Sequence, residues 1–403
     1  MSEFDATSKR SDLPPRTLTG KYKYGLPGLV CLAIVVAFAT TKLRKDVINL
    51  PEGVSQAAAE EMRREYVELF HREPDEADLM MALAETAVRN KQPDVAISCF
   101  ERIPSDHIRY GTSARFQEAQ VLLRANRVEK AEASFREFLT LQENRPGVKR
   151  EHIRTARAWL AFLMTIELRF EDRNLILQQM IQNGEFDVYD AKQLYFPSLS
   201  ANYSTQISSR LGDFLEQAPT CRSLLIAQAR YLVRQGKLNA ADHLLESLRL
   251  QYPTDSESIA ATLECLFEMV DWKRFESVIS DAPNFKPDEP WLLTQMRAEF
   301  ARFSRDWPTA EMYFRKVLES DPANPACHMG LASALQSLGK TEERKKIQER
   351  SLILAKIRVY LSAVDQNSPG GSRALARDAK SMGMFEAAQS FELLADRIER
   401  GAR

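Results

Sequence analysis

Four prolines recur at nearly constant spacing in the second half of the chain. Pro219, Pro253, Pro287 and Pro322 follow one another at intervals of 34, 34 and 35 residues. Proline has no N–H to donate and clashes with the preceding helical turn, so it ends helices. A period in this range is typical of stacked helical hairpins. The spacing therefore predicts an all-α chain built from repeated pairs of antiparallel helices.

The window that begins at Arg222 indicates how such a pair would pack. The small residues Ala229 and Ala241 fall where two antiparallel helices would cross, and Gly236 falls in the turn between them. Helices approach closely only where neither carries a bulky side chain at the crossing. Three leucines supply the apolar seam of the pair: Leu232, Leu245 and Leu248.

This pattern resembles the tetratricopeptide repeat, which has small residues at its eighth and twentieth positions, an apolar residue at the twenty-fourth and proline at the thirty-second. The eighth positions here are Ala84, Ala119, Ala161, Ala229, Ala298 and Ala332. The twentieth positions are Ala96, Ala131, Ala241 and Ala310. The twenty-fourth positions are Phe100, Phe135, Leu177, Leu211, Leu245, Ile279 and Phe314. The resemblance covers roughly residues 77–400 and implies a right-handed superhelical solenoid of antiparallel hairpins.

Some windows depart from this signature. Tyr195 and Leu263 replace the first small residue. The second is replaced by Arg173, Ile207, Phe275 and Arg344. The window 188–221 also contains Pro197 and several serines, so we expect it to be partly irregular.

The sequence divides into six segments of different character. We expect a disordered tail, a transmembrane helix, a linker, a capping helix, a tetratricopeptide-like solenoid, and a C-terminal helix pair with a cap. Their ranges are 1–23, 24–43, 44–54, 55–74, 75–365 and 366–403, in that order.

Residues 24–41 carry no charge and would cover about 27 Å as a helix, just enough to cross a hydrocarbon core. Two other interpretations remain open. Ala37-Phe38-Ala39 has the form of a signal cleavage site, and the segment could also be a buried helix. Basic residues before the segment slightly outnumber those after it. The positive-inside rule then places the N-terminus in the cytoplasm and the solenoid outside it.

Charge and motifs favour no catalytic or nucleic-acid-binding function. The 55 basic and 56 acidic residues nearly cancel, whereas a nucleic-acid surface needs a basic stripe. The chain has no glycine-rich phosphate loop, no H-E-x-x-H and no G-x-S-x-G. Its five histidines are scattered, and its five cysteines form no C-x-x-C pair. We therefore expect no enzyme activity, cofactor, metal or small-molecule substrate.

The resemblance implies a binding groove on the concave face, formed by the first helix of each hairpin. The residues at the ligand-contacting positions of the family are Phe116, Gln120, Arg124, Arg230, Arg234, Glu264, Phe267, Glu299, Arg302 and Phe303. Aromatic rings beside charges suit a peptide, because the ring supplies buried area and the charge supplies register. Each of these residues could instead be an ordinary packing or solvated residue.

Chaperone-binding members of the family use lysine at the fifth and asparagine at the ninth position of successive repeats. This chain has Ile226 and Arg230 at these positions in one window and Ala260 and Glu264 in the next. A receptor for chaperone tails is therefore not expected. The sequence favours a membrane-anchored scaffold that binds an unidentified protein or extended peptide. The alternatives are a non-catalytic regulatory or positioning subunit of a membrane or envelope enzyme complex, and an enzyme with an unrecognised helical active site.

Overall fold

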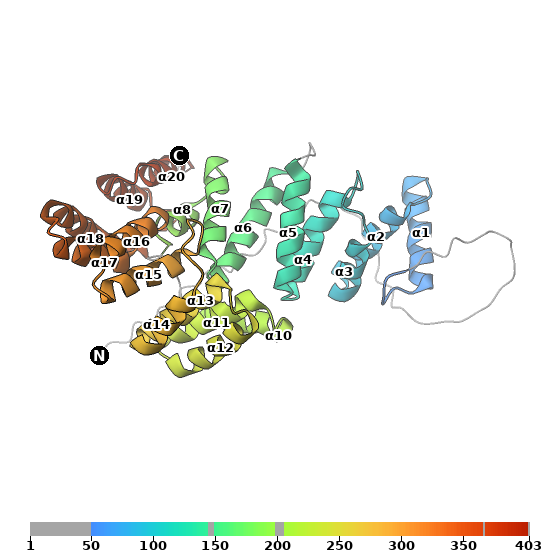
Figure 1. Cartoon of the computed structure of the whole chain (residues 1–403). Helices are drawn as coiled ribbons and strands as arrows, with labels where there is room; N and C mark the ends of the chain where they lie inside the picture. Colours follow the sequence, from blue (N-terminus) through green and yellow to red (C-terminus); the bar gives the residue numbers. More distant parts are fainter. Residues whose placement is uncertain (1–49, 144–148, 198–204, 366, 402–403) are drawn as a thin grey trace, which may run out of the picture. The chain divides into compact units, whose positions relative to one another are not determined.

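The computed structural model describes residues 50–143, 149–197, 205–365 and 367–401 (Figure 1). All described residues belong to one compact unit, residues 49–403. No helix in the described ranges is long and apolar enough to cross a membrane. The expected tail at 1–23 and transmembrane helix at 24–43 lie outside these ranges, as does most of the linker at 44–54.

The described part of the chain is helical and contains no strand, which confirms the expected fold class at that level. In the described ranges, the helices up to α11 are α1 (Gln56–Phe70), α2 (Glu76–Arg89), α3 (Pro93–Glu101), α4 (Gly111–Arg124), α5 (Val128–Glu143), α6 (Arg150–Ile166), α7 (Phe170–Gln182), α8 (Val188–Tyr195), α10 (Thr205–Gln217) and α11 (Arg222–Arg234). The others are α12 (Leu238–Gln251), α13 (Ser256–Glu268), α14 (Trp272–Asp281), α15 (Trp291–Phe303), α16 (Trp307–Ser320), α17 (Pro325–Ser337), α18 (Thr341–Leu361), α19 (Pro369–Ser381) and α20 (Phe385–Gly401).

The periodic prolines end helices at three of their four positions. Pro219, Pro253 and Pro322 each lie two residues beyond the last residue of α10, α12 and α16. Pro287 does not end a helix, because α14 already ends at Asp281. Pro283 holds the equivalent place there, two residues beyond α14. The regular spacing therefore marks the repeat, although one helix is shorter than the spacing predicts.

Within the described ranges, eight hairpins share one turn geometry, and the α7–α8 turn at Gly184 has it as well. In each, the second residue after the first helix has a positive φ, and the next N–H donates to a carbonyl five residues back, as in a Schellman motif. Gly236 and Gly339 adopt this conformation without strain. The other residues in this position are Lys91, Asn126, Leu168, Val270, Arg305 and Gly383.

The small residues of the repeat signature lie at helix crossings. Ala96, Ala131, Ala241 and Ala310 are completely buried, as are the neighbouring Phe100, Phe135 and Phe314. Ala332 is the exception, because it is only partly buried. The close contact in that hairpin is made by Gly330 instead, where a Cβ would lie 2.2 Å from Cζ of Phe314.

The expected capping helix is α1. It packs on α2, and a single carboxylate links the two helices to the segment before α4. Asp78 accepts hydrogen bonds from the hydroxyls of Tyr66 (2.7 Å) and Tyr110 (2.8 Å), and from the guanidinium of Arg109 (2.9 Å). Arg72 also pairs with it, at 2.7 Å. These donors outweigh the effect of burial and hold the pKa of Asp78 well below its usual value.

The repeats do not pack only on their sequence neighbours, as an open solenoid would. The last hairpin, α19 and α20, returns to the middle of the chain, where α20 packs on α8 (Figure 1). Phe391 of α20 stacks on Phe196 at 6.0 Å, and both rings are completely buried. Arg397 donates to the carbonyl oxygen of Phe186 at 2.9 Å. The C-terminal pair therefore completes the core around α8.

Candidate functional site

The predicted groove residues fall in two sets of hairpins. We call α2 to α7 the N-terminal array and α11 to α18 the C-terminal array. In each, the first helices of successive hairpins carry the positions that face a ligand in the family. The two arrays differ in what covers these positions.

In the C-terminal array, the predicted residues Arg230, Arg234 and Glu264 form one ion-paired cluster. Nε of Arg230 lies 2.9 Å from Oε2 of Glu264, and Nη2 of Arg234 lies 2.5 Å from Oε1. Arg230 and Glu264 are buried, whereas the side chain of Arg234 is partly exposed. Burial alone would raise the pKa of Glu264, but the two guanidinium groups outweigh it and lower that pKa.

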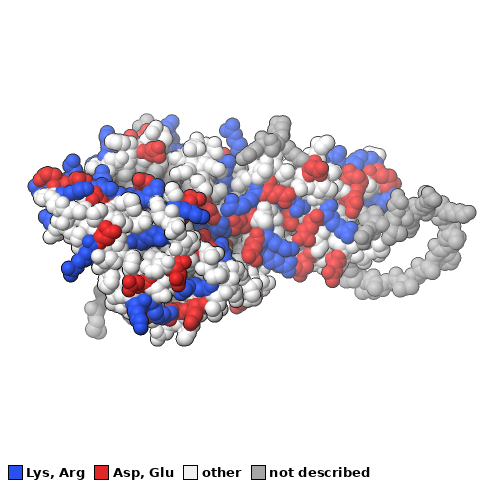
Figure 2. Space-filling model, in the orientation of Figure 1, with Lys and Arg blue, Asp and Glu red and all other residues white. Residues whose placement is uncertain are grey.

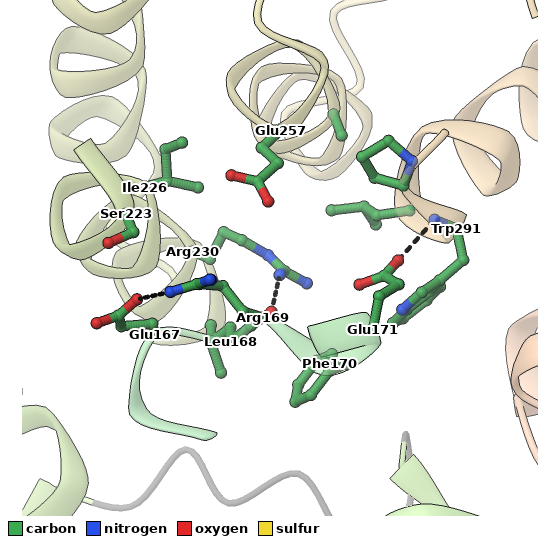
Figure 3. A pocket seen from close by; sticks show the side chains of 13 residues that line it. Glu167, Leu168, Arg169, Phe170, Glu171, Ser223, Ile226, Arg230, Glu257 and Trp291 are labelled. Atoms are coloured by element: carbon green, nitrogen blue, oxygen red, sulfur yellow. Dashed lines mark hydrogen bonds and ion pairs between the residues drawn. The ribbon is translucent and has the colours of Figure 1, made fainter. Parts of the chain in front are cut away.

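The chain itself fills the space in front of this cluster. The turn between α6 and α7 lies against α11, α13 and the start of α15 (Figure 3). Nη1 of Arg230 donates to the carbonyl oxygen of Leu168 at 3.3 Å, and the backbone N–H of Trp291 donates to Oε1 of Glu171 at 2.8 Å. The ring of Phe170 stacks on Trp291 at 6.0 Å. We call residues 167–171 the joint segment.

The joint segment is fixed by charges as well as by rings. Nη1 of Arg169 lies 3.0 Å from Oε2 of Glu167 and 2.8 Å from Oε2 of Glu132. Burial raises the pKa of Glu167, and the neighbouring Arg169 only partly offsets this. The cavity left between the joint segment and the C-terminal array is about 40 Å³. A volume of this size has room for a few water molecules, so little open space separates the joint segment from the C-terminal array.

The predicted residues of the N-terminal array are placed differently. Phe116 is buried and stacks on His152 of α6 at 4.5 Å, so it joins α4 to α6. Gln120 is half-buried and Arg124 is exposed. In the described part of the chain, the guanidinium of Arg124 forms no ion pair.

Two aromatic residues of α6 extend this surface and were not predicted. Phe162 is exposed, and its ring lies edge-on to Trp159 at 5.6 Å. Arg124 lies eight residues beyond Phe116 in α4, and Phe162 lies ten residues beyond His152 in α6. At 1.5 Å per residue, each side chain lies about 12 or 15 Å along its own helix from the Phe116–His152 contact, towards the C-terminal end of that helix. The signal in the sequence was the ninth position of the window from 154, which Phe162 occupies.

The remaining predicted residues lie at the edge of the C-terminal array. Nη2 of Arg302 lies 2.7 Å from Oε2 of Glu299, and burial raises the pKa of Glu299 despite this pairing. Phe267 and Phe303 both contact Trp272 of α14, at centroid distances of 5.7 and 4.2 Å. Phe303 remains exposed. Arg302 and Glu299 are thus engaged in an ion pair, and Phe267 and Phe303 pack on Trp272. Only part of the surface of these side chains faces solvent.

The described residues contain no group of three or more His, Cys, Asp or Glu side chains placed to hold a metal ion. The cysteines at positions 99, 221, 265 and 327 are buried, and burial raises the thiol pKa of Cys99 and Cys265 to about 11. A thiol with so high a pKa is a poor nucleophile at neutral pH. Charges of both signs are interspersed over the face shown in Figure 2, where no extended basic stripe is visible.

The chain is similar to several solved structures at low sequence identity. A tetratricopeptide repeat protein from Parabacteroides merdae is 13% identical, with a TM-score of 0.31, over 64% of this chain and 99% of its own. Human IFIT1, as a dimer with PPP-AAAA, is 15% identical, with a TM-score of 0.31, over 85% and 86%. The Cut9–Hcn1 hetero-tetramer of the APC/C is 12% identical, with a TM-score of 0.35, over 84% and 77%. These scores are too low for any property of those proteins to be carried over.

No curated protein matches the chain. One family model does, and its match falls on the N-terminal array, from the middle of α2 through α5. That model describes the tetratricopeptide repeat, and it covers residues 81–149. Residues 81–149 therefore match the tetratricopeptide repeat, and the match coincides with the hairpins α2–α3 and α4–α5 of the N-terminal array.

Proposed function

We propose that the chain is a protein-interaction scaffold whose ligand groove is the concave face of the N-terminal array. The observation that carries this proposal is the contrast between the arrays. The joint segment covers Arg230 and Glu264, whereas Arg124 and Phe162 are exposed. Tetratricopeptide repeats generally mediate protein–protein interactions, and the family match lies on this array.

The chemistry of the groove selects the kind of segment it would bind. The exposed edge of Phe162, backed by Trp159, offers an apolar contact for one side chain. The guanidinium of Arg124, which has no ion-pair partner among the described residues, offers a bidentate contact for a carboxylate. An extended segment with an acidic residue near an apolar one fits both. Gln120, half-buried about one helical turn before Arg124 in α4, can bind the backbone of such a segment.

The test is photo-crosslinking in cells. A benzoylphenylalanine at position 124 should give a discrete crosslinked product, and Phe162→Ala in the same chain should strongly reduce its yield. The matched control places the crosslinker at Thr140, which is exposed on the second helix of the same hairpin. Equal products from positions 124 and 140, or a product that survives Phe162→Ala, would exclude the groove as the binding site.

Membrane attachment through residues 24–43 is a second part of the proposal, with the N-terminus in the cytoplasm and the repeats outside it. It is supported by the uncharged run and by the slight excess of basic residues before it. An impermeant protease added to intact spheroplasts should then digest the repeats. Protection of the repeats until the membrane is broken would reverse the orientation. A partner that proves to be an enzyme would make the chain its non-catalytic positioning subunit.

A further inference from the structure

The joint segment lies against the ligand-facing positions of the C-terminal array, where a bound peptide would lie (Figure 3). We infer that the joint segment is a displaceable internal ligand of this array, and that a partner segment with an aromatic residue followed by an acidic one competes with it. The C-terminal array is then a second groove, which the chain itself holds closed. This inference goes beyond the proposed scaffold and does not depend on the N-terminal groove.

The first observation is which groups of the joint segment meet the C-terminal array. The carbonyl oxygen of Leu168 accepts a hydrogen bond from Arg230. The ring of Phe170 stacks on Trp291, and the carboxylate of Glu171 accepts from the backbone N–H of Trp291. One backbone carbonyl, one ring and one carboxylate thus make the contact. An extended peptide in a groove is held by the same kinds of group.

Arg169 lies between these residues and has a different role. Its guanidinium pairs with Glu132 of α5 at 2.8 Å, with Glu167 at 3.0 Å and with Asp172 at 2.9 Å. These carboxylates belong to the N-terminal array or to the joint segment itself. Arg169 therefore ties the joint segment to the N-terminal array. The side chains that meet the C-terminal array are an aromatic residue and the acidic residue after it, which defines the competing partner.

The second observation is that few contacts hold the joint segment in place. The hydrogen bond from Arg230 to Leu168 measures 3.3 Å, whereas such bonds are usually about 2.9 Å. The guanidinium of Arg230 lies 5.9 Å from the centroid of Phe170, near the limit of about 6 Å for a cation–π contact. Among the described helices, α7 does not pack extensively on α11, α13 or α15. Docking therefore depends on a few side chains and not on helix packing.

The closed arrangement also buries charge. Glu167 of the joint segment and Glu257 of α13 both line the cavity between the segment and the C-terminal array. Burial raises the pKa of both carboxyls, and the neighbouring Arg169 and Arg222 only partly offset this. A carboxylate with a raised pKa is less stable in its charged form here than in water. Opening lets water reach both carboxylates, which offsets part of the cost of separating the contacts.

The covalent attachment of the joint segment determines how a competitor behaves. A tethered ligand has an effective concentration on the order of 1 mM, so it excludes a free peptide of similar intrinsic affinity at micromolar concentration. The apparent affinity of the groove for the free peptide is reduced in proportion to the fraction of molecules that are open. Weakening the internal contact should therefore strengthen binding of the free peptide.

The test uses the full chain and a fluorescein-labelled peptide with the sequence of residues 166–172. Wild type should bind this peptide weakly. Glu171→Ala removes the acceptor for the N–H of Trp291, so it should bind the peptide about tenfold more tightly. A second peptide, with alanine in place of the phenylalanine, should bind neither protein. Benzoylphenylalanine at that place in the peptide should crosslink to α15, which begins at Trp291.

The matched control is Glu171→Gln, which keeps an oxygen to accept from the N–H of Trp291 and should bind the peptide as weakly as wild type does. Glu171 is exposed, so both variants should keep the Tm of wild type, which separates opening from unfolding. The inference is overturned if Glu171→Ala and wild type bind the peptide equally, if neither binds it, or if the crosslink lies outside α11, α13 and α15. Crosslinking at position 124 is unaffected by any of these outcomes.

Discussion

The hydroxyl oxygens of Tyr195 and Ser390 lie 3.0 Å apart, although 195 residues of sequence separate them. Next to this contact, Phe391 is completely buried against Phe196. The C-terminal hairpin is therefore part of the core around α8, where a regular repeat is absent. The predictions below concern this closure, the joint between the arrays and the crossings within the repeats.

Phe391→Ala should destabilise the fold by about 3–5 kcal/mol, because it leaves a cavity in a buried aromatic contact. Its effect should extend to α8 as well as to α20. Hydrogen exchange measured by mass spectrometry should show lost protection in residues 188–195 and 385–401 together. The control is Leu393→Ala, on the exposed face of the same helix, which should change protection little. Unchanged exchange in α8 would show that the closure does not couple the two segments.

Glu264→Gln should cost about 3–5 kcal/mol of folding stability, because Arg230 would remain buried without a charged partner. Urea unfolding at pH 7 measures this. The carboxyl pKa of Glu264 is lowered in the folded state from the ordinary 4.5, so its contribution is complete above pH 4.5 and is lost as the pH falls below that value. The difference in free energy of unfolding between wild type and Glu264→Gln should therefore become smaller below pH 4.5. A difference that stays constant down to pH 3 would contradict the ion pair.

Gly330→Ala should destabilise the chain by about 1–3 kcal/mol, because the new methyl group would overlap the ring of Phe314, which is completely buried. The matched control is Gly212→Ala in α10, where an added Cβ meets nothing within 4 Å. Alanine has the higher helix propensity, so this control should be neutral or more stable by up to about 1 kcal/mol. Thermal unfolding of the two variants compares them, and equal Tm values would show that the crossing at Gly330 is not tight.

Asp190→Asn should stabilise the chain at pH 8 by about 1–2 kcal/mol. Burial, reinforced by the carboxylate of Asp187, raises the pKa of Asp190 from 3.8 to about 7. An acid whose folded-state pKa is raised makes the fold less stable as the pH rises from about 4 to 7. Asparagine keeps an oxygen to accept from the N–H of Asp187, now at 3.0 Å, without the charge. At pH 4 wild type and Asp190→Asn should have the same free energy of unfolding. A stability difference that is the same at pH 4 and pH 8 would refute the raised pKa of Asp190.

The local fold could be predicted because helix crossings and turns leave marks in the sequence. Ala96, Ala131 and Ala241 fall at buried crossings, and Gly236 adopts the left-handed turn. What could not be predicted is long-range packing. Nothing in the spacing shows that Phe391 meets Phe196, or that Leu168 meets Arg230, because these contacts depend on the path of the chain through the degenerate window at 188–221.

The candidate binding residues were predicted from their places in the repeat, and those places do not determine whether a side chain is accessible. Arg230 and Glu264 have the ligand-facing places of the repeat, yet they pair with each other under the joint segment. Phe116 has such a place as well and is buried against His152. A sequence pattern gives the face of a helix on which a residue lies, but whether another part of the chain covers that face depends on tertiary contacts. A binding role stays a prediction for all ten residues, and Gln120, Arg124, Arg234, Arg302 and Phe303 retain exposed surface.

The joint segment has a consequence for how this chain can change over evolution. Open repeat arrays grow and shrink by duplicating or deleting whole repeats, because each unit needs only its neighbours. Here, one more hairpin between α7 and α11 would move Leu168 away from Arg230, and one more after α11 would move α20 away from α8. These two contacts therefore constrain the number of repeats. We expect related proteins to differ by substitutions and loop insertions rather than by the number of repeats.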